Sequence, residues 1–217
     1  MEKKSIARRL LLYILGAQSL AAGMMLLVRS NLGVSVGTSV YYVLSQRFTA
    51  LSLGVWNYLA HGFVLILMMI ILRKVKLFYL ASFLTSMFVG YSMDFYGLLL
   101  PEDFHSIVLR IVLLCMGIMG IALGVSLIYV SGLPAAPFDT FSKEISKHFN
   151  WKISVVKTAF DITCVSLSVI LGMIFFRKTV GIGIGTVISA LISGTLVGYF
   201  KKMLEESHFI VEEVAQK

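Results

Sequence analysis

The sequence predicts an all-α polytopic membrane protein. We expect six transmembrane helices in two pseudo-symmetric, inverted three-helix repeats, each with one short broken or re-entrant helix. The first observation behind this prediction is composition. Of the 217 residues, 58% are hydrophobic and 14% are charged, against about 25% charged in a soluble domain. With a mean hydropathy of +0.90, the chain has too few polar residues to cover a water-soluble globule, so a bilayer is its natural solvent.

The net charge of +8 does not indicate nucleic-acid binding. The basic residues cluster at the ends of apolar runs, as in membrane proteins, rather than along one face. The two cysteines, Cys115 and Cys164, each lie inside an apolar run and are predicted to be buried small hydrophobes.

The second observation is the set of long apolar stretches. Crossing a bilayer takes roughly 20 residues of helix. The first stretch follows a basic N-terminus and so resembles a secretory signal, but its pattern recurs in the second half, which favours a retained helix. The six predicted spans are Leu10–Val28, Leu51–Leu72, Leu77–Leu100, Ile107–Val130, Ile153–Phe176 and Val180–Phe200.

Two shorter segments, Thr38–Phe48 and Asp139–Phe149, separate the first span from the second and the fourth from the fifth. Both are too short to span. Asp139–Phe149 has apolar residues on one helical face and charged residues on the other, which is also typical of a helix lying on the membrane surface. The sequence leaves the re-entrant and interfacial alternatives open for both segments.

The third observation is an internal repeat with an offset of 101 residues. It aligns Gly16 with Gly117, Gly23 with Gly124, and Ser30 with Ser131; later, Gly90 aligns with Gly194 after small insertions. We therefore divide the chain into repeats 1–105 and 106–203, followed by a cytoplasmic tail, 204–217.

Counting crossings predicts how the repeats are oriented. If the short segments do not span the membrane, each repeat crosses it three times and the second repeat is inverted relative to the first. If they do span it, the chain has eight transmembrane helices and the two repeats have the same orientation. Six spans with both termini cytoplasmic place most basic residues inside, which favours that topology and a location in the cell membrane. The inner basic residues are then Lys3, Lys4, Arg8, Arg9, Arg73, Lys74, Lys76, Lys143, Lys147, Lys152, Lys201 and Lys202.

Ionisable residues inside predicted spans are candidates for a binding site, because charge in hydrocarbon costs several kcal/mol. Lys157 and Asp161 are four residues apart, so they share a helical face and can pair. They form either a structural ion pair or the wall of a solute or proton path. Asn57 and His61, with the same spacing, occupy the matching region of the first repeat.

Asp139 follows Pro137 and opens the second short segment, where it serves either as a helix N-cap or as part of a site at the positive end of the helix. Thr38 and Ser39 are the equivalent residues in the first half. Asp94 lies deep in the third span and needs a partner, either Lys157 or a backbone group.

The chain contains no His-Glu-x-x-His, no Gly-x-Ser-x-Gly and no phosphate-binding loop. We therefore expect no enzyme activity, no cofactor and no metal site.

Several motifs resemble the YczE/YyaS/YitT group of bacterial integral membrane proteins. They are Gly124 followed by Ser-Gly-Leu-Pro-x-x-Pro-x-Asp (131–139), Trp-Lys-Ile-Ser (151–154) and Thr-Val-Gly-Ile-Gly-Ile-Gly-Thr (179–186). The group commonly has Gly-Leu-Gly where this chain has Gly132-Leu-Pro134. The resemblance implies a bacterial cytoplasmic-membrane protein without a settled biochemical activity.

Two functions follow from these features as alternatives. The first is a small-solute transporter or permease with a polar site between the repeats, formed by Asp139, Lys157, Asp161, Asn57, His61, Thr38, Ser39 and Asp94. The second is a membrane accessory or scaffold that acts through protein partners. The expected partners are the lipid bilayer, a small polar solute and a second copy of the chain in a homodimer, with no nucleic acid.

Overall fold

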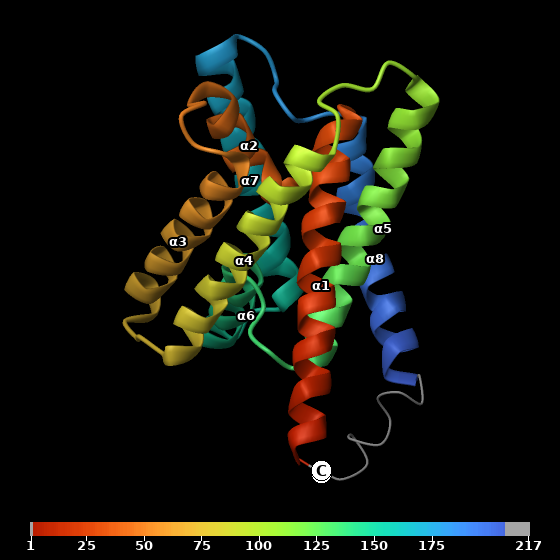
Figure 1. The fold of residues 1–217 in the computed structure, drawn as a ribbon. Coiled ribbons are helices and arrows are strands. Elements are labelled where there is room, and N and C mark those ends of the chain that lie inside the picture. Colours follow the sequence, from red (N-terminus) through yellow and green to blue (C-terminus); the bar gives the residue numbers. More distant parts are fainter. Residues whose placement is uncertain (1, 207–217) are drawn as a thin grey trace.

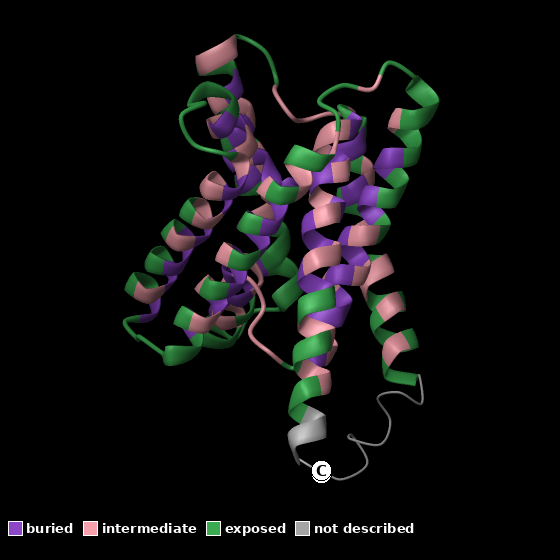
Figure 2. Cartoon of the chain, in the orientation of Figure 1, coloured by how far each residue is buried: buried purple, intermediate pink, exposed green. Residues whose placement is uncertain are grey.

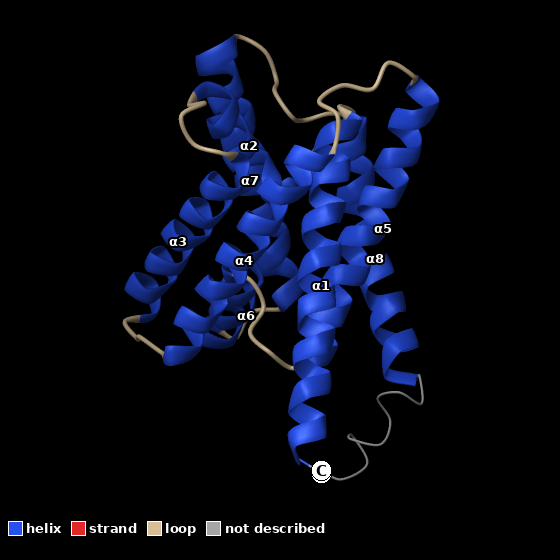
Figure 3. Ribbon diagram, in the orientation of Figure 1, coloured by secondary structure: helices blue, strands red, loops and turns tan. Residues whose placement is uncertain are grey.

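The computed structural model describes residues 2–206, and this range folds into eight helices without a strand (Figures 1 and 3). Six helices are long and two are short. They are α1 (Glu2–Ser30), α2 (Val36–Arg47), α3 (Leu53–Leu72), α4 (Leu77–Leu99), α5 (Ile107–Ser131), α6 (Pro137–Phe149), α7 (Ile153–Phe176) and α8 (Ile184–Glu206). The order of long and short helices is that predicted from the sequence. Most of the predicted tail, 207–217, lies outside the described residues.

Five of the described helices, namely α1, α3, α5, α7 and α8, are long and apolar enough to cross a membrane. The chain is therefore a multi-pass helical membrane protein. The remaining predicted span, Leu77–Leu100, corresponds to α4, which has 23 residues but is not among the five. Its hydropathy is reduced by serine and threonine residues on its buried face, including Ser82, Thr85 and Ser86, which are fully buried.

Buried residues follow the helix faces that turn toward the centre of the bundle, and exposed residues cover its outside (Figure 2). Many of the exposed side chains are large and apolar, such as Phe63, Ile70, Leu84 and Leu191. An apolar exterior of this kind is suited to hydrocarbon rather than to water.

Helices α1 and α5 cross at the centre through glycines. A methyl group added at Gly23 would lie 2.8 Å from the carbonyl oxygen of Gly117, and one at Gly16 would lie 2.9 Å from that of Gly124. Only residues without a side chain allow backbones to approach so closely. Because the residue numbers rise on one helix as they fall on the other, the two helices are antiparallel.

The chain repeats the same local geometry after each of these two helices. Ser30 donates its hydroxyl to the Leu27 carbonyl and accepts the Leu32 N–H. Ser131, 101 residues later, donates to the Ile128 carbonyl and accepts the Leu133 N–H. The residues that follow, Asn31 and Gly132, both have a positive φ, at 53° and 67°.

Each short helix packs against the long helices of the other half of the chain. Helix α2 contacts α7, and Ser168 of α7 donates a hydrogen bond to the Ser39 carbonyl. Helix α6 contacts α3 as well as α7, and its buried Ile145 joins Leu72 and Tyr79 in a small apolar cluster. The two short helices thereby link the halves of the chain to each other.

The two outer helix pairs differ in how closely they pack. In the first half, α3 and α4 lie in contact, and a methyl group at Gly90 would come within 2.6 Å of the Gly54 carbonyl oxygen. In the second half, α7 and α8 form no extended contact. Gly194, which matches Gly90 in the repeat, has no neighbouring atom within 4 Å of an added methyl group, and neither has Gly198. Gly194 and Gly198 form a Gly-x-x-x-Gly motif, which typically allows two helices to approach closely, but no described residue packs against either glycine.

Candidate functional site

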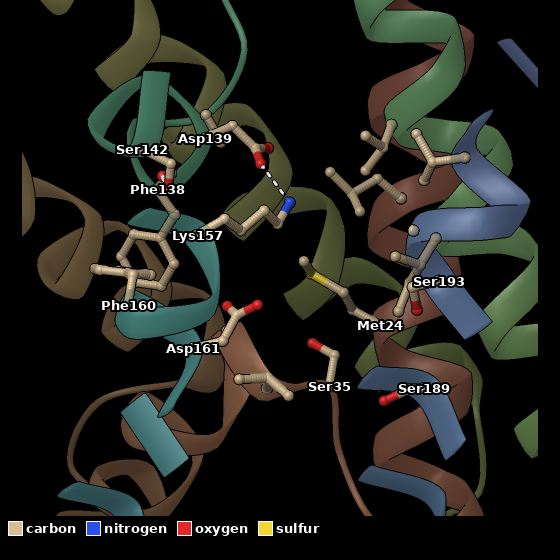
Figure 4. Close-up of a pocket in the computed structure, with 18 of the residues that line it drawn as sticks. Met24, Ser35, Phe138, Asp139, Ser142, Lys157, Phe160, Asp161, Ser189 and Ser193 are labelled. Carbon is tan, nitrogen blue, oxygen red and sulfur yellow. Dashed lines mark hydrogen bonds and ion pairs between the residues drawn. The ribbon is translucent and has the colours of Figure 1, made fainter. Parts of the chain in front are cut away.

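A cavity of about 520 Å³ lies between α7 on one side and α1 and α8 on the other (Figure 4). Its volume is in the range of small-molecule sites in proteins, roughly 300–1,000 Å³. Both halves of the chain contribute to its wall. The polar and charged residues among those that line it include Asn57, His61, Asp139, Lys157, Asp161, Ser189 and Ser193.

An ion pair crosses from α7 to α6 at the edge of the cavity. Lys157 Nζ lies 3.2 Å from Asp139 Oδ1 (Figure 4). The i,i+4 pairing of Lys157 with Asp161, which the sequence favours, is not formed, because the Lys157 side chain extends toward α6. Asp139 is also not the N-cap of α6. Ala136 holds that position and Pro137 begins the helix, so the carboxylate is free to reach across to α7.

Asp161 extends from α7 into the cavity, and its carboxylate faces the side where Ser189 and Ser193 of α8 lie (Figure 4). Within residues 2–206, it forms no hydrogen bond and no ion pair. Since Lys157 is paired with Asp139, the three charges that line the cavity sum to −1 when both carboxylates are ionised. This excess negative charge is centred on Asp161.

Two polar side chains from α3 are buried against the cavity with unused hydrogen-bonding atoms. Asn57, 1% exposed, donates from Nδ2 to the Ser86 carbonyl at 3.0 Å, but its Oδ1 has no partner in the described chain. His61, 6% exposed, has no partner at Nδ1. A buried polar atom without a hydrogen bond costs about 1–3 kcal/mol, so a bound molecule that satisfies these atoms would be favoured.

Aromatic rings form the wall between these polar groups. The His61 ring stacks on Phe138 at 3.9 Å between centroids, and Phe138 meets Phe160 edge-on at 5.1 Å. Phe138 and Phe160 both line the cavity. The stack holds the imidazole in one orientation and gives the cavity an apolar surface beside its charges.

The sequence did not identify the α8 side of the cavity. Ser189 and Ser193 are four residues apart and both line it, as does Met24 of α1 (Figure 4). Serine is common in helix interfaces within membranes, so these residues carried no distinctive signal. The one usable signal in the sequence is that Ser189 and Ser193 are four residues apart, as Lys157 and Asp161 are, so each pair lies on one face of its helix.

Three predicted site residues lie elsewhere. Thr38 and Ser39 are buried in α2, where Thr38 bonds the hydroxyls of Ser35 and Tyr41. Asp94 binds α4 to the start of α3: it accepts hydrogen bonds from the Ser52 hydroxyl at 2.5 Å and the Gly54 N–H at 2.8 Å. Of the two alternatives that the sequence left open, Asp94 has the backbone partner, together with the Ser52 hydroxyl, and it does not pair with Lys157.

A second cavity of about 640 Å³ adjoins the first, and Asp139 and Tyr129 line both. Its wall is basic, with Lys76, Lys143 and Lys201, and it also contains Glu144. Lys76 Nζ lies 2.6 Å from Glu144 Oε2, which also accepts the Tyr79 hydroxyl. Partial burial raises the pKa of Glu144, but these hydrogen bonds and the Lys76 charge outweigh it, so the net pKa is below 4.5.

Among the described residues, no group of three or more His, Cys, Asp or Glu side chains is placed to hold a metal ion. The paired and unpaired charges of the cavity instead suit a small polar molecule.

Comparison with known proteins places the chain in a family but gives it no function. No curated protein and no solved structure matches the chain. The model of one protein family matches residues 7–202, nearly the whole described chain. The chain therefore belongs to DUF6198, a family of unknown function.

Proposed function

We propose that this protein is a small-solute transporter of the bacterial cell membrane, with its solute site in the cavity between the two halves of the chain. The observation that carries this proposal is the cavity lining. Asn57 and His61 from the first half and Asp139, Lys157 and Asp161 from the second meet at one space. Ionisable and unpaired polar groups are expensive within a membrane bundle, and they typically mark solute or ion paths.

We further propose that the chain is an inverted repeat with six membrane crossings, in which α4 crosses in addition to the five helices named above. Support comes from the antiparallel crossing of α1 and α5, which the repeat aligns with each other. In Figure 1, α1 and α4 run upward while their counterparts α5 and α8 run downward. The matched turns at Ser30 and Ser131 add to this support. Many secondary transporters are built this way, with the site between the repeats.

Such transporters change state when one repeat moves against the other around a fixed site, and we propose that here the two repeats exchange conformations. The closed α3–α4 pair and the open α7–α8 pair are two conformations of matched elements. In the alternate state, α7 would pack on α8 through Gly194 as α3 now packs on α4 through Gly90. The α3–α4 pair would open in return.

The side to which the cavity opens follows from charge. The adjoining cavity is lined by Lys76, Lys143 and Lys201, and lysines gather on the cytoplasmic side of membrane proteins. We therefore propose that the described state is open to the cytoplasm and that both termini are cytoplasmic. The resemblance to the YczE/YyaS/YitT group, also part of this proposal, agrees with a cytoplasmic-membrane location.

The test is uptake and export by the purified protein in reconstituted vesicles, across a panel of small solutes, with Asp139→Asn and Asp161→Asn as variants. We expect saturable movement of at least one solute, reduced at least about tenfold in both variants, the equivalent of 1.4 kcal/mol. Unchanged movement in both variants would overturn the site.

A protein that moves no solute in the panel, yet co-purifies with the same membrane partner in wild-type and variant forms, would instead be an accessory or scaffold. In that case, the polar residues would serve packing alone.

A further inference from the structure

We propose that the solute is a small organic cation carrying N–H donors, bound between Asp161 of α7 and the facing side of α8. This inference rests on the proposed function and names the substrate class of the same cavity.

The first argument is charge. Asp139 and Lys157 neutralise each other at 3.2 Å, which leaves Asp161 as the one unpaired charge among the described residues that line the cavity. A carboxylate partly withdrawn from water gains most from a cation. Within this cavity, an anionic solute would meet the Asp161 carboxylate and would have to break the Asp139–Lys157 pair to find a positive partner.

The second argument comes from comparing the two halves. Arg73 and Arg177, 104 residues apart, both end their helices with a positive φ, at 48° and 55°. At that spacing, Asn57 corresponds to Asp161. In the closed half, the Asn57 amide donates to the Ser86 carbonyl of α4 and so joins α3 to α4.

Asp161 cannot make the equivalent bond, because a carboxylate has no hydrogen to donate to a carbonyl of α8. A bound cation with N–H groups supplies the missing donors. It can donate to Asp161 and, on its other side, to acceptors on α8 such as the Ser189 and Ser193 hydroxyls that line the cavity. The solute would then join α7 to α8 as Asn57 joins α3 to α4, which links binding to closure.

The third argument is the remaining wall. Phe138 and Phe160 both line the same space, and Asn57 Oδ1 is a buried acceptor without a partner among the described residues. Aromatic rings attract cations, and an unpaired acceptor favours a molecule with donors. An ammonium or guanidinium group on a small apolar body satisfies all three features.

The experiment compares three probes of similar shape and different charge: 2-phenylethylamine (cation), 2-phenylethanol (neutral) and phenylacetate (anion). Saturable binding to the purified, full-length protein is measured for wild type, Asp161→Asn and Asp161→Glu. Asp103→Asn, which removes an exposed loop carboxylate, is the matched control. We expect the wild type to bind the amine best, Asp161→Asn to weaken it at least about tenfold, and Asp161→Glu and Asp103→Asn to retain it.

Preference for phenylacetate or phenylethanol, equal amine binding by wild type and a monodisperse Asp161→Asn, or no amine binding would overturn the inference. Counterflow in vesicles separates it from the proposed function. Amine binding without counterflow of any probe supports the cation site and contradicts transport. Counterflow of phenylacetate alone supports transport and contradicts the cation site.

Discussion

Lys157 of α7 and Asp139 of α6 form an ion pair at 3.2 Å, and both residues line the cavity that the two halves of the chain enclose. The pair connects a short helix to a long one at the boundary with the second, basic cavity, since Asp139 lines both. It therefore links α6 to α7 and also balances the positive charge of Lys157 within the site.

The pair predicts non-additive effects of substitution. Asp139→Asn removes the partner of the Lys157 charge, and Lys157→Gln removes the partner of the Asp139 charge. Each substitution should therefore lower the melting temperature in detergent. The double variant has neither charge and should lose less stability than the sum of the two single losses, by about 1 kcal/mol or less for a partly exposed pair. Strictly additive losses, measured by thermal unfolding, would show that the two side chains do not stabilise each other.

The glycine crossing of α1 and α5 predicts a position-specific packing effect. Gly23→Ala adds a methyl group 2.6 Å from the Ile121 nitrogen and 2.8 Å from the Gly117 oxygen. Overpacking of this kind costs about 1–3 kcal/mol, so the melting temperature should fall. Gly198→Ala is the control, because its methyl group meets no atom within 4 Å and alanine favours helix by about 1 kcal/mol. Equal losses in both variants would contradict the crossing.

The Lys76–Glu144 pair predicts a dependence of stability on pH. Because the pKa of Glu144 is lowered below 4.5 in the fold, its contribution is present above pH 4.5 and is lost as the pH falls through the folded value. Glu144→Gln should therefore lower stability at pH 7, by about 1 kcal/mol or less for a partly exposed pair.

The difference between Glu144→Gln and wild type should shrink as the pH is lowered below 4.5. Thermal unfolding of both proteins from pH 7 to pH 3.5 measures it. A difference that stays constant over this range would show that Glu144 does not act through its charge.

The unequal packing of the two outer helix pairs predicts opposite movements. Spin labels at Ile162 of α7 and Leu191 of α8 lie on exposed faces, 61% and 76% exposed. Labels at Ile66 of α3 and Leu84 of α4, 55% and 64% exposed, form the comparison pair in the first half. Each pair of labels is introduced into a chain in which Cys115 and Cys164 have been replaced, so that the native cysteines are not labelled.

On conversion to the alternate state, driven by 2-phenylethylamine or by a pH gradient across vesicles, the α7–α8 distance should shorten. The α3–α4 distance should lengthen in the same sample. Electron–electron double resonance measures both distances. Movement of both pairs in the same direction would contradict an exchange of conformations between the repeats.

The sequence predicts the order of elements well, because apolar length and glycine spacing are local properties. The six long helices and the two short ones follow from such patterns. The repeat also placed Asn57 and His61 on the same cavity as Asp139, Lys157 and Asp161.

Side-chain partners could not be predicted in the same way. The spacing of Lys157 and Asp161 favours a pair within one helix, but α6 brings Asp139 to Lys157, and only the packing of α6 determines that. Likewise, the bond from Gly54 to Asp94 depends on how closely α3 meets α4. The aligned glycines Gly90 and Gly194 gave no sign that one would be packed and the other open.

The most direct test of alternating access to the cavity uses Ser193, which lines it from α8. Ser193→Cys, in the chain with both native cysteines replaced, is treated with a membrane-impermeant thiol reagent in inside-out and right-side-out vesicles. We predict labelling from the cytoplasmic side at rest. Under a solute or pH gradient, labelling should decrease on that side and increase on the opposite one. Labelling from neither side under any condition, in a variant that folds and inserts, would contradict a solute path through the cavity.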